Sequence, residues 1–174
     1  MKIEKQLLKS LLVMADIIEA RDPYTGGHVW RVSQYAKLLA TKVGVSKDEA
    51  IRASIGGYLH DIGKVGISDS ILLKKGPLSP EEFEIVKTHP LIGSRLICEH
   101  PLGKLFDEHV LYHHERVDGQ GYANGVAGDG LSLQARIINI VDAFACYDQH
   151  APVPGWDVVG DCYVETGAGR RGSV

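Results

Sequence analysis

The adjacent residues His60 and Asp61 are the feature of this sequence that most directly indicates chemistry. An imidazole next to a carboxylate offers two ligands for iron, manganese or zinc at one point of the chain. A carboxylate can also bridge two metals with its two oxygens, which a single imidazole nitrogen cannot do. The doublet therefore predicts a metal site whose other ligands lie elsewhere in the sequence.

Further candidate ligands lie on separate expected helices or at their ends: His28, His89, His113, His114 and Asp142. Asp142 lies inside the apolar run 135–144, where a buried carboxylate is costly unless it is paired or bound to metal. Each residue alone has another interpretation. His28 could be a partly buried helix residue, His89 a cap before a proline, and Asp142 a hydrogen-bond acceptor. These alternative interpretations would all have to be correct at once for five imidazoles and two carboxylates, so a shared metal site is favoured.

Composition limits what surrounds such a site. With 174 residues and 44% hydrophobic content, the chain can bury one core, and a second domain of ordinary size is not expected. The net charge of -3 argues against nucleic acid as a general partner. Three cysteines without C-x-x-C spacing predict no disulfide framework and favour a reducing cytoplasm. No signal peptide and no apolar stretch of membrane-spanning length is found, so we expect a cytoplasmic protein without a membrane span.

The spacing of apolar residues predicts an all-α fold. Ser46 with Glu49 forms a capping box, and Ser79-Pro80 followed by two acids is a strong helix start. The segment 117–130 is too rich in glycine to be anything but a loop. The expected helices cover 3–20, 25–43, 46–60, 79–90, 91–99, 104–114 and 131–144.

The sequence resembles the HD-GYP subgroup of the HD metal-dependent phosphohydrolases. The resemblance covers nearly all of residues 1 to 144. The His-Asp doublet indicates only the large HD superfamily, whereas His-His-Glu followed by Asp-Gly-x-Gly-Tyr is specific to the subgroup. The matching motifs are 22–28 (DPYTGGH), 59–67 (LHDIGKVGI), 89–90 (HP), 113–122 (HHERVDGQGY) and the Asp142 segment.

The resemblance implies an HD-domain helical bundle with a glycine-rich GYP-type loop, which hydrolyses cyclic di-GMP to pGpG and often on to GMP. Carried over by position, one metal would be held by His28, His60, Asp61 and Asp142, and the other by Asp61, His89, His113 and His114. The family also has a three-metal type with a glutamate one turn before the first histidine. Tyr24 stands at that position here, so two metals are expected, with iron or manganese as the occupants.

Two such cations, about 3.5–4 Å apart, can share a water, lower its pKa and neutralise charge on a phosphoryl group. The expected nucleophile is therefore a hydroxide that bridges the two metals, which also share the ligand Asp61. Lys64 lies one helical turn after the doublet, where its ammonium can reach the same phosphate. The alternative for Lys64 is a solvated lysine at a helix end.

The loop 118–125 resembles the segment that gives the subgroup its name, but Ala123 replaces the proline. Loss of that stiffness should matter more for loop order and for partners than for metal binding. GGDEF-type or other signalling proteins are the partners that the resemblance implies for this loop. Candidate contacts to substrate are Arg116, Asp118, Gly121, Tyr122 and Arg136; for both arginines, solvation at the surface is the alternative.

The sequence departs from the family after Phe144. Codons allowed for residues 146–156, read one base later, can encode the family continuation Ala-Met-Thr-Ser-Thr-Arg-Pro-Tyr-Arg. This agreement predicts a one-base frameshift near codon 145. The HD-GYP domain would then be 1–144, incomplete at its C-terminal end, with 145–174 a divergent and disordered tail. A genuine divergent extension is the alternative.

The leading functional hypothesis is a cyclic di-GMP phosphodiesterase. The second is a weakly active or inactive module that binds the nucleotide or a protein through the loop, which Ala123 and the altered tail favour. An HD hydrolase of another nucleotide is the third. The apolar face of 3–18 could serve a homodimer or pack inside the domain.

Overall fold

The computed structural model describes residues 2–22 and 26–149, and within these ranges all regular secondary structure is helical. The predicted all-α class is therefore confirmed. Tyr24, on which the choice between two and three metals depends, lies outside the described residues. Residues 150–174 of the predicted tail 145–174 lie outside them as well.

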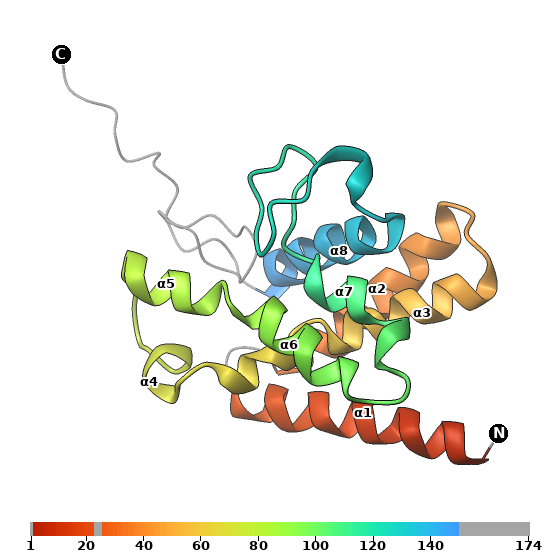
Figure 1. Ribbon diagram of the computed structural model, residues 1–174, viewed down its shortest axis with the longest axis horizontal. Helices are drawn as coiled ribbons and strands as arrows, with labels where there is room; N and C mark the ends of the chain where they lie inside the picture. Colours follow the sequence, from red (N-terminus) through yellow and green to blue (C-terminus); the bar gives the residue numbers. More distant parts are fainter. Residues whose placement is uncertain (1, 23–25, 150–174) are drawn as a thin grey trace.

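Three long helices form one half of the fold (Figure 1): α2 (His28–Lys42), α3 (Lys47–Leu59) and α8 (Leu133–Gln149). The capping box predicted at Ser46 and Glu49 starts α3. Small side chains between the helices let their backbones approach closely, and larger aliphatic ones from α8 fill the remaining space. The buried cluster comprises Val32, Ala36, Ala40, Ala50, Ala53, Ile137, Ile138, Val141 and Ala145, together with Cys146 nearby.

A second cluster packs α1 (Lys2–Arg21), α6 (His89–Cys98) and α7 (Asp107–Leu111) against the end of α3. In Figure 1, α1 runs along the side of the molecule opposite the loop that precedes α8. Since α3 contributes to both clusters, its C-terminal end, where His60 and Asp61 follow, is fixed from two sides. The cluster comprises Leu11, Ala15, Ile18, Leu59, Ile62, Ile97, Phe106 and Val110.

A short 3-10 helix, η1 (Ile62–Gly66), follows the doublet and crosses α6 at backbone contact. A Cβ on Gly63 would lie 1.8 Å from the carbonyl oxygen of His89 and 2.5 Å from the amide nitrogen of Gly93. Only glycine permits this approach, which brings Asp61 next to the start of α6.

The side chain of Arg21, at the end of α1, fixes the far side of η1. Its guanidinium donates to the carbonyls of Val65 at 3.1 Å and Ile67 at 2.6 Å, and to the carboxylate of Asp69 at 2.8 Å. Asp69 begins α4 (Asp69–Leu72), and α5 (Pro80–Val86) follows with the capping box of Ser79 and Glu82. The predicted helix start at Ser79 is therefore confirmed.

Several helix boundaries differ from the predictions. The helix expected over 104–114 is divided into η2 (Gly103–Leu105) and α7, because Phe106 turns into the core with 3% exposure. His113 and His114 therefore follow α7 instead of ending it. The helix that starts at Ser79 ends at Val86, before the predicted end near 90, and α6 already begins at His89, where Pro90 suits a first helical turn.

The loop before α8 contains η3 (Gly128–Gly130) and is otherwise irregular, as predicted for 117–130. Helix α8 continues past the expected boundary at 144 as far as Gln149, with Ala145 and Cys146 buried. Cys98 is a free thiol. Among the described residues, no helix is both long and apolar enough to cross a membrane.

Replacing Gly63 by alanine should destabilise the protein by about 3 kcal/mol, because the added methyl group meets backbone atoms that cannot move aside. Chemical denaturation measures the change. Gly26→Ala is the matched control, since a Cβ there has no atom within 4 Å. Equal midpoints for Gly63→Ala and the wild type would contradict the backbone contact between η1 and α6.

Candidate metal centre

All seven predicted ligands meet in the interior of the described fold. They come from the start of α2, the end of α3, the start of α6, the segment after α7, and α8. None is more than 7% exposed, so water contributes little to their solvation. The residues are His28, His60, Asp61, His89, His113, His114 and Asp142.

One group of side chains joins α2, α3 and α8. His28 Nε2 lies 3.0 Å from Asp142 Oδ1, and the same oxygen lies 3.5 Å from His60 Nε2. Candidate ligand atoms of His28, His60 and Asp61 all lie within 4.8 Å of one another. Cys146 Sγ is also near His28 and Asp142, at 3.8 Å from Asp142 Oδ1.

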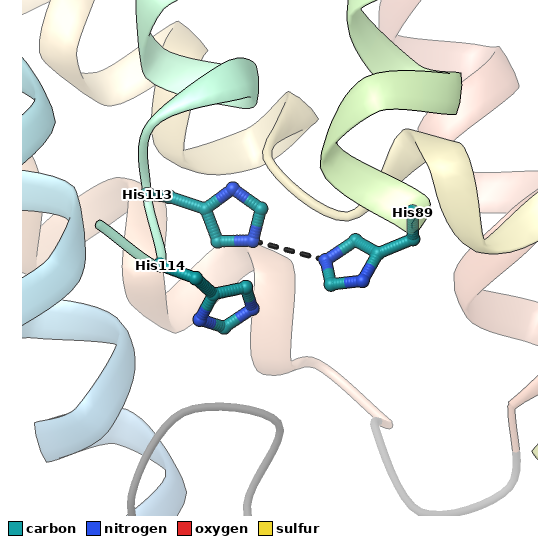
Figure 2. A group of neighbouring side chains, drawn as sticks. All are labelled: His89, His113 and His114. Carbon is teal, nitrogen blue, oxygen red and sulfur yellow. Dashed lines mark hydrogen bonds between the residues drawn. The ribbon is translucent and has the colours of Figure 1, made fainter. Parts of the chain in front are cut away.

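The second group consists of three imidazoles. Figure 2 shows His89, at the start of α6, facing His113 and His114 from the segment after α7. Their candidate ligand atoms lie within 4.8 Å of one another. The Nε2 atoms of His89 and His113 are only 3.1 Å apart.

Three of the imidazoles are oriented in the same way by the backbone. In each, Nδ1 lies 2.7 or 2.8 Å from the carbonyl oxygen three residues earlier, which makes Nδ1 the protonated nitrogen. Each Nε2 then presents a lone pair to the interior, the arrangement that metal-bound histidines require. The residues are His60 with Gly57, His89 with Val86, and His113 with Val110.

Two of the buried atoms at the centre lack hydrogen bonds within the described residues, namely His60 Nε2 and Asp61 Oδ1. In addition, the facing Nε2 atoms of His89 and His113 cannot both be acceptors in one hydrogen bond; a cation or an extra proton has to lie between them. A dry site rich in lone pairs and poor in donors fits a divalent metal, since the unpaired atoms would otherwise cost free energy.

Asp61 lies between the two groups. Its Oδ2 is 3.3 Å from His60 Nε2, and its Oδ1 is 3.4 Å from His89 Nε2. Each carboxylate oxygen therefore faces a different group of imidazoles. This arrangement is the geometry that a bridging carboxylate requires.

At His60 and Asp142, burial and the neighbouring groups shift the pKa values in opposite directions. Burial alone would lower the pKa of His60, but the carboxylates of Asp61 and Asp142 outweigh it and raise that pKa well above its ordinary value. Burial would likewise raise the pKa of Asp142, but the neighbouring imidazoles of His28 and His60 hold it well below the usual range. Burial and the neighbouring imidazoles lower the pKa of His113. A metal at His60 would therefore replace a proton.

The ammonium of Lys64 lies at the edge of this centre. Its Nζ is 2.9 Å from Asp61 Oδ2 and 4.0 Å from Asp22 Oδ2, and the side chain is 12% exposed. Asp22 is itself buried, and sequence reasoning did not assign it a role. Lys64 thus contacts the Asp61 carboxylate, and its role toward the substrate stays a prediction.

Two of the predicted substrate contacts, Arg116 and Asp118, are exposed, unlike the buried ligands. Arg116 and Asp118 form an exposed ion pair with an N–O distance of 2.6 Å, and together with Val117 and Asn139 they line an open groove. Arg116 and the amide of Gln120 lower the pKa of Asp118 to about 2.

The other predicted contacts hold the loop. The guanidinium of Arg136 donates to the carbonyls of Leu131 and Gly128, at 3.0 and 2.9 Å. Gly121 packs against the backbone between His114 and Arg116, and the Tyr122 ring stacks on His114. Their roles as substrate contacts stay predictions.

Two residues that support the ligands were not assigned a role at the site from the sequence. The amide of Asn139 donates to the carbonyls of His113 and Glu115, at 2.9 and 3.2 Å. Glu115 is 2% exposed, and its Oε1 accepts the amide of Asn124 at 2.6 Å. Asn139 lies one helical turn before Asp142, on the same face of α8, and this spacing could have identified it.

The comparison with known families identifies the class of protein. Residues 12–152 match the family model described as HD domain. Two solved structures share the fold. Bd1817, a HDG"Y"P protein from Bdellovibrio bacteriovorus, has a TM-score of 0.55 and 25% identity, and the match covers 70% of this chain and 39% of that one. The HD domain of the Listeria monocytogenes phosphodiesterase PgpH, in complex with cyclic-di-AMP, has a TM-score of 0.59 and 19% identity, and the match covers 81% of this chain and 75% of that one.

Curated relatives narrow the family. The cyclic di-GMP phosphodiesterase response regulator RpfG of Xanthomonas campestris is 37% identical over 82% of this chain and 38% of its own. A cyclic di-GMP phosphodiesterase of Thermotoga maritima is 38% identical over 81% and 39%, and the 3'3'-cGAMP-specific phosphodiesterase 3 of Vibrio cholerae is 37% identical over 78% and 30%. This chain therefore belongs to the HD domain family and, within it, to the HD-GYP subgroup. It spans less than two fifths of each of these three relatives.

Replacing Asp142 by asparagine should weaken metal binding at least ten-fold, because an anionic oxygen between His28 and His60 is lost; even changes outside the ligand shell cost about 10–100-fold. Calorimetric titration with Mn²⁺ measures the effect. His100→Gln is the control, because His100 contacts Ser10 on α1. Wild-type affinity in Asp142→Asn would exclude Asp142 as a ligand.

Proposed function

We propose that this chain is a metal-dependent phosphodiesterase that hydrolyses cyclic di-GMP to pGpG. The observation that carries the proposal is the position of Asp61, whose two oxygens face two separate groups of buried imidazoles. The relatives that are named as cyclic di-GMP phosphodiesterases support the choice of substrate.

The donor set suits two divalent metals, with iron or manganese as the proposed occupants. One would be held by His28, His60, Asp61 and Asp142, and the other by Asp61, His89, His113 and His114. Imidazole nitrogens and carboxylate oxygens without a thiolate are the donors that suit these metals. When bound, such a pair lowers the pKa of a shared water and neutralises charge on a phosphoryl group.

The residues of the chain supply position and charge around that reaction. The walls of the site are dry, since all seven proposed ligands are buried, and electrostatic attraction to a phosphate is correspondingly strong. The ammonium of Lys64, next to Asp61, would donate to a phosphoryl oxygen and stabilise the charge that develops on the leaving 3'-oxygen. Asp22 lies on the other side of this ammonium and keeps it directed at the centre.

A second candidate is hydrolysis of a related cyclic dinucleotide. Relatives named as 3'3'-cGAMP-specific phosphodiesterases are 30–38% identical to this chain, a range that includes the values for the cyclic di-GMP enzymes. A module that binds nucleotide or protein without turnover is the third candidate, favoured by Ala123 in the loop. Binding of GGDEF-type proteins at this loop and homodimerisation remain predictions.

The purified chain loaded with Mn²⁺ or Fe²⁺ should convert cyclic di-GMP to pGpG, and removal of the metals with a chelator should abolish the conversion. Chromatography of the products, with 3'3'-cGAMP, cyclic di-AMP and pGpG as alternative substrates, separates the candidates. Two bound metals without turnover of any of these substrates would exclude the enzyme and leave the binding module.

Replacing Lys64 by methionine should lower kcat about 100-fold, the effect of losing one preorganised donor to the transition state, while the metal content stays unchanged. Lys37→Met is the matched control, because Lys37 is exposed on α2. If Lys64→Met retains wild-type kcat, the lysine does not contact the reacting phosphate.

We also propose that the HD-GYP domain ends at residue 144 and that 145–174 result from a one-base frameshift. The support is that the codons allowed from residue 146 onward can encode the family continuation when they are read one base later. Sequencing the DNA of this stretch should reveal one extra or missing base near codon 145. An intact reading frame with unrelated codons would exclude the frameshift and leave a divergent extension.

A further inference from the structure

Tyr122 of the glycine-rich loop makes direct contact with a proposed metal ligand. Its ring lies against His114 with a distance of 4.7 Å between ring centroids and an angle of 29° between the planes, which is a stacked arrangement. His114 is 4% exposed. A stacked ring limits how far the imidazole can tilt, and the tilt of an imidazole decides whether its lone pair reaches a metal.

The backbone of the loop fixes Tyr122 in this position. The amide of Tyr122 donates to the carbonyl of His114 itself, at 3.2 Å. A Cβ on the preceding Gly121 would lie 2.4 Å from the amide nitrogen of Arg116, so only glycine allows the loop to lie this close. The loop is also held by the bond between the Glu115 carboxylate and the Asn124 amide, at 2.6 Å. The closely packed backbone of the loop therefore holds the Tyr122 ring against His114.

Helix α5 contacts the same ring. Phe83 meets it edge to face, with 6.4 Å between centroids and an angle of 79°. Lys87 Nζ lies 5.0 Å from the Phe83 centroid and 5.9 Å from that of Tyr122, within the range of a cation–π contact. Edge-to-face aromatic pairs add stabilisation beyond their buried area. Tyr122 thus lies between His114 and α5.

We propose that Tyr122 is a positioning residue for His114, and that the tyrosine of the loop acts on the metal site of His89, His113 and His114 through ring stacking. This inference rests on the proposed two-metal centre and deepens it. It assigns the Tyr122 ring a role at the ligand instead of the substrate contact expected from the sequence. Phe83 on α5 supports the ring from outside the site.

The test is a titration of the metal-free chain with Mn²⁺ by calorimetry, which needs no substrate. Tyr122→Leu should retain one metal at wild-type affinity and bind the other about ten-fold more weakly, since outer partners of ligands typically contribute 10–100-fold. Tyr122→Phe keeps the stacked ring and should bind both metals as the wild type does. Rescue by phenylalanine separates stacking from a role of the phenol hydroxyl.

Tyr35→Leu is the matched control, because Tyr35 is also a tyrosine in an edge-to-face pair, with Phe144 at 5.2 Å between centroids. It should lower the denaturation midpoint without changing either metal affinity. Phe83→Leu leaves Tyr122 in place and is the test variant to use if Tyr122→Leu does not fold. It should weaken the same metal by a smaller factor.

Electron paramagnetic resonance gives a second readout. With two equivalents of Mn²⁺, the wild type should show the signal of a coupled pair, whereas Tyr122→Leu should show uncoupled Mn²⁺. Wild-type affinities in both Tyr122→Leu and Phe83→Leu would overturn the proposal, as would a wild-type chain that binds a single metal. Normal binding of two metals without cyclic di-GMP turnover would contradict the proposed substrate alone.

Discussion

The structure depends on one costly constraint, which is the burial of the Asp61 carboxylate among imidazoles. Burial would raise the pKa of this group, yet His60 and Lys64 outweigh it and hold the pKa well below its usual range. One oxygen nevertheless lacks a hydrogen bond within the described residues. Such an arrangement is unfavourable in free energy for a protein that only needs to fold, because an apolar residue of similar size could be buried without the loss of hydration that a carboxylate suffers. A metal bound at this centre would offset that cost.

The two apolar clusters hold this centre from both sides. One joins α2, α3 and α8, and the other joins α1, α6 and α7 to the end of α3. Three imidazoles are then oriented by the same local device, a carbonyl three residues earlier in the chain. This hydrogen bond forms at the end of α3, at the start of α6 and after α7, because the backbone makes a helix-like turn at each place. Rigid elements thus orient the histidines before any metal arrives.

The sequence predicted those parts of the structure that local rules control. Capping residues placed the starts of α3 and α5, and the chemistry of His60 and Asp61 identified residues that do meet in space. The division of the helix expected over 104–114 was not predictable, because it depends on Phe106 reaching the core of α1 and α3. The hydrogen-bond partners of long side chains could not be predicted either. Arg136 reaches two carbonyls eight and five residues before it, and no pattern in the sequence indicates which partner a guanidinium will choose.

The loop 118–125 illustrates how tertiary contacts change the meaning of a substitution. Proline would stiffen this loop, so Ala123 was expected to affect its order. The contacts that hold the loop come from other residues, namely Gly121 against the Arg116 amide, the Tyr122 amide on His114, and Asn124 on Glu115. None of these contacts uses the side chain at position 123. Since the loop is fixed at both sides of this position, alanine can be accepted without releasing Tyr122 from the imidazole on which it stacks.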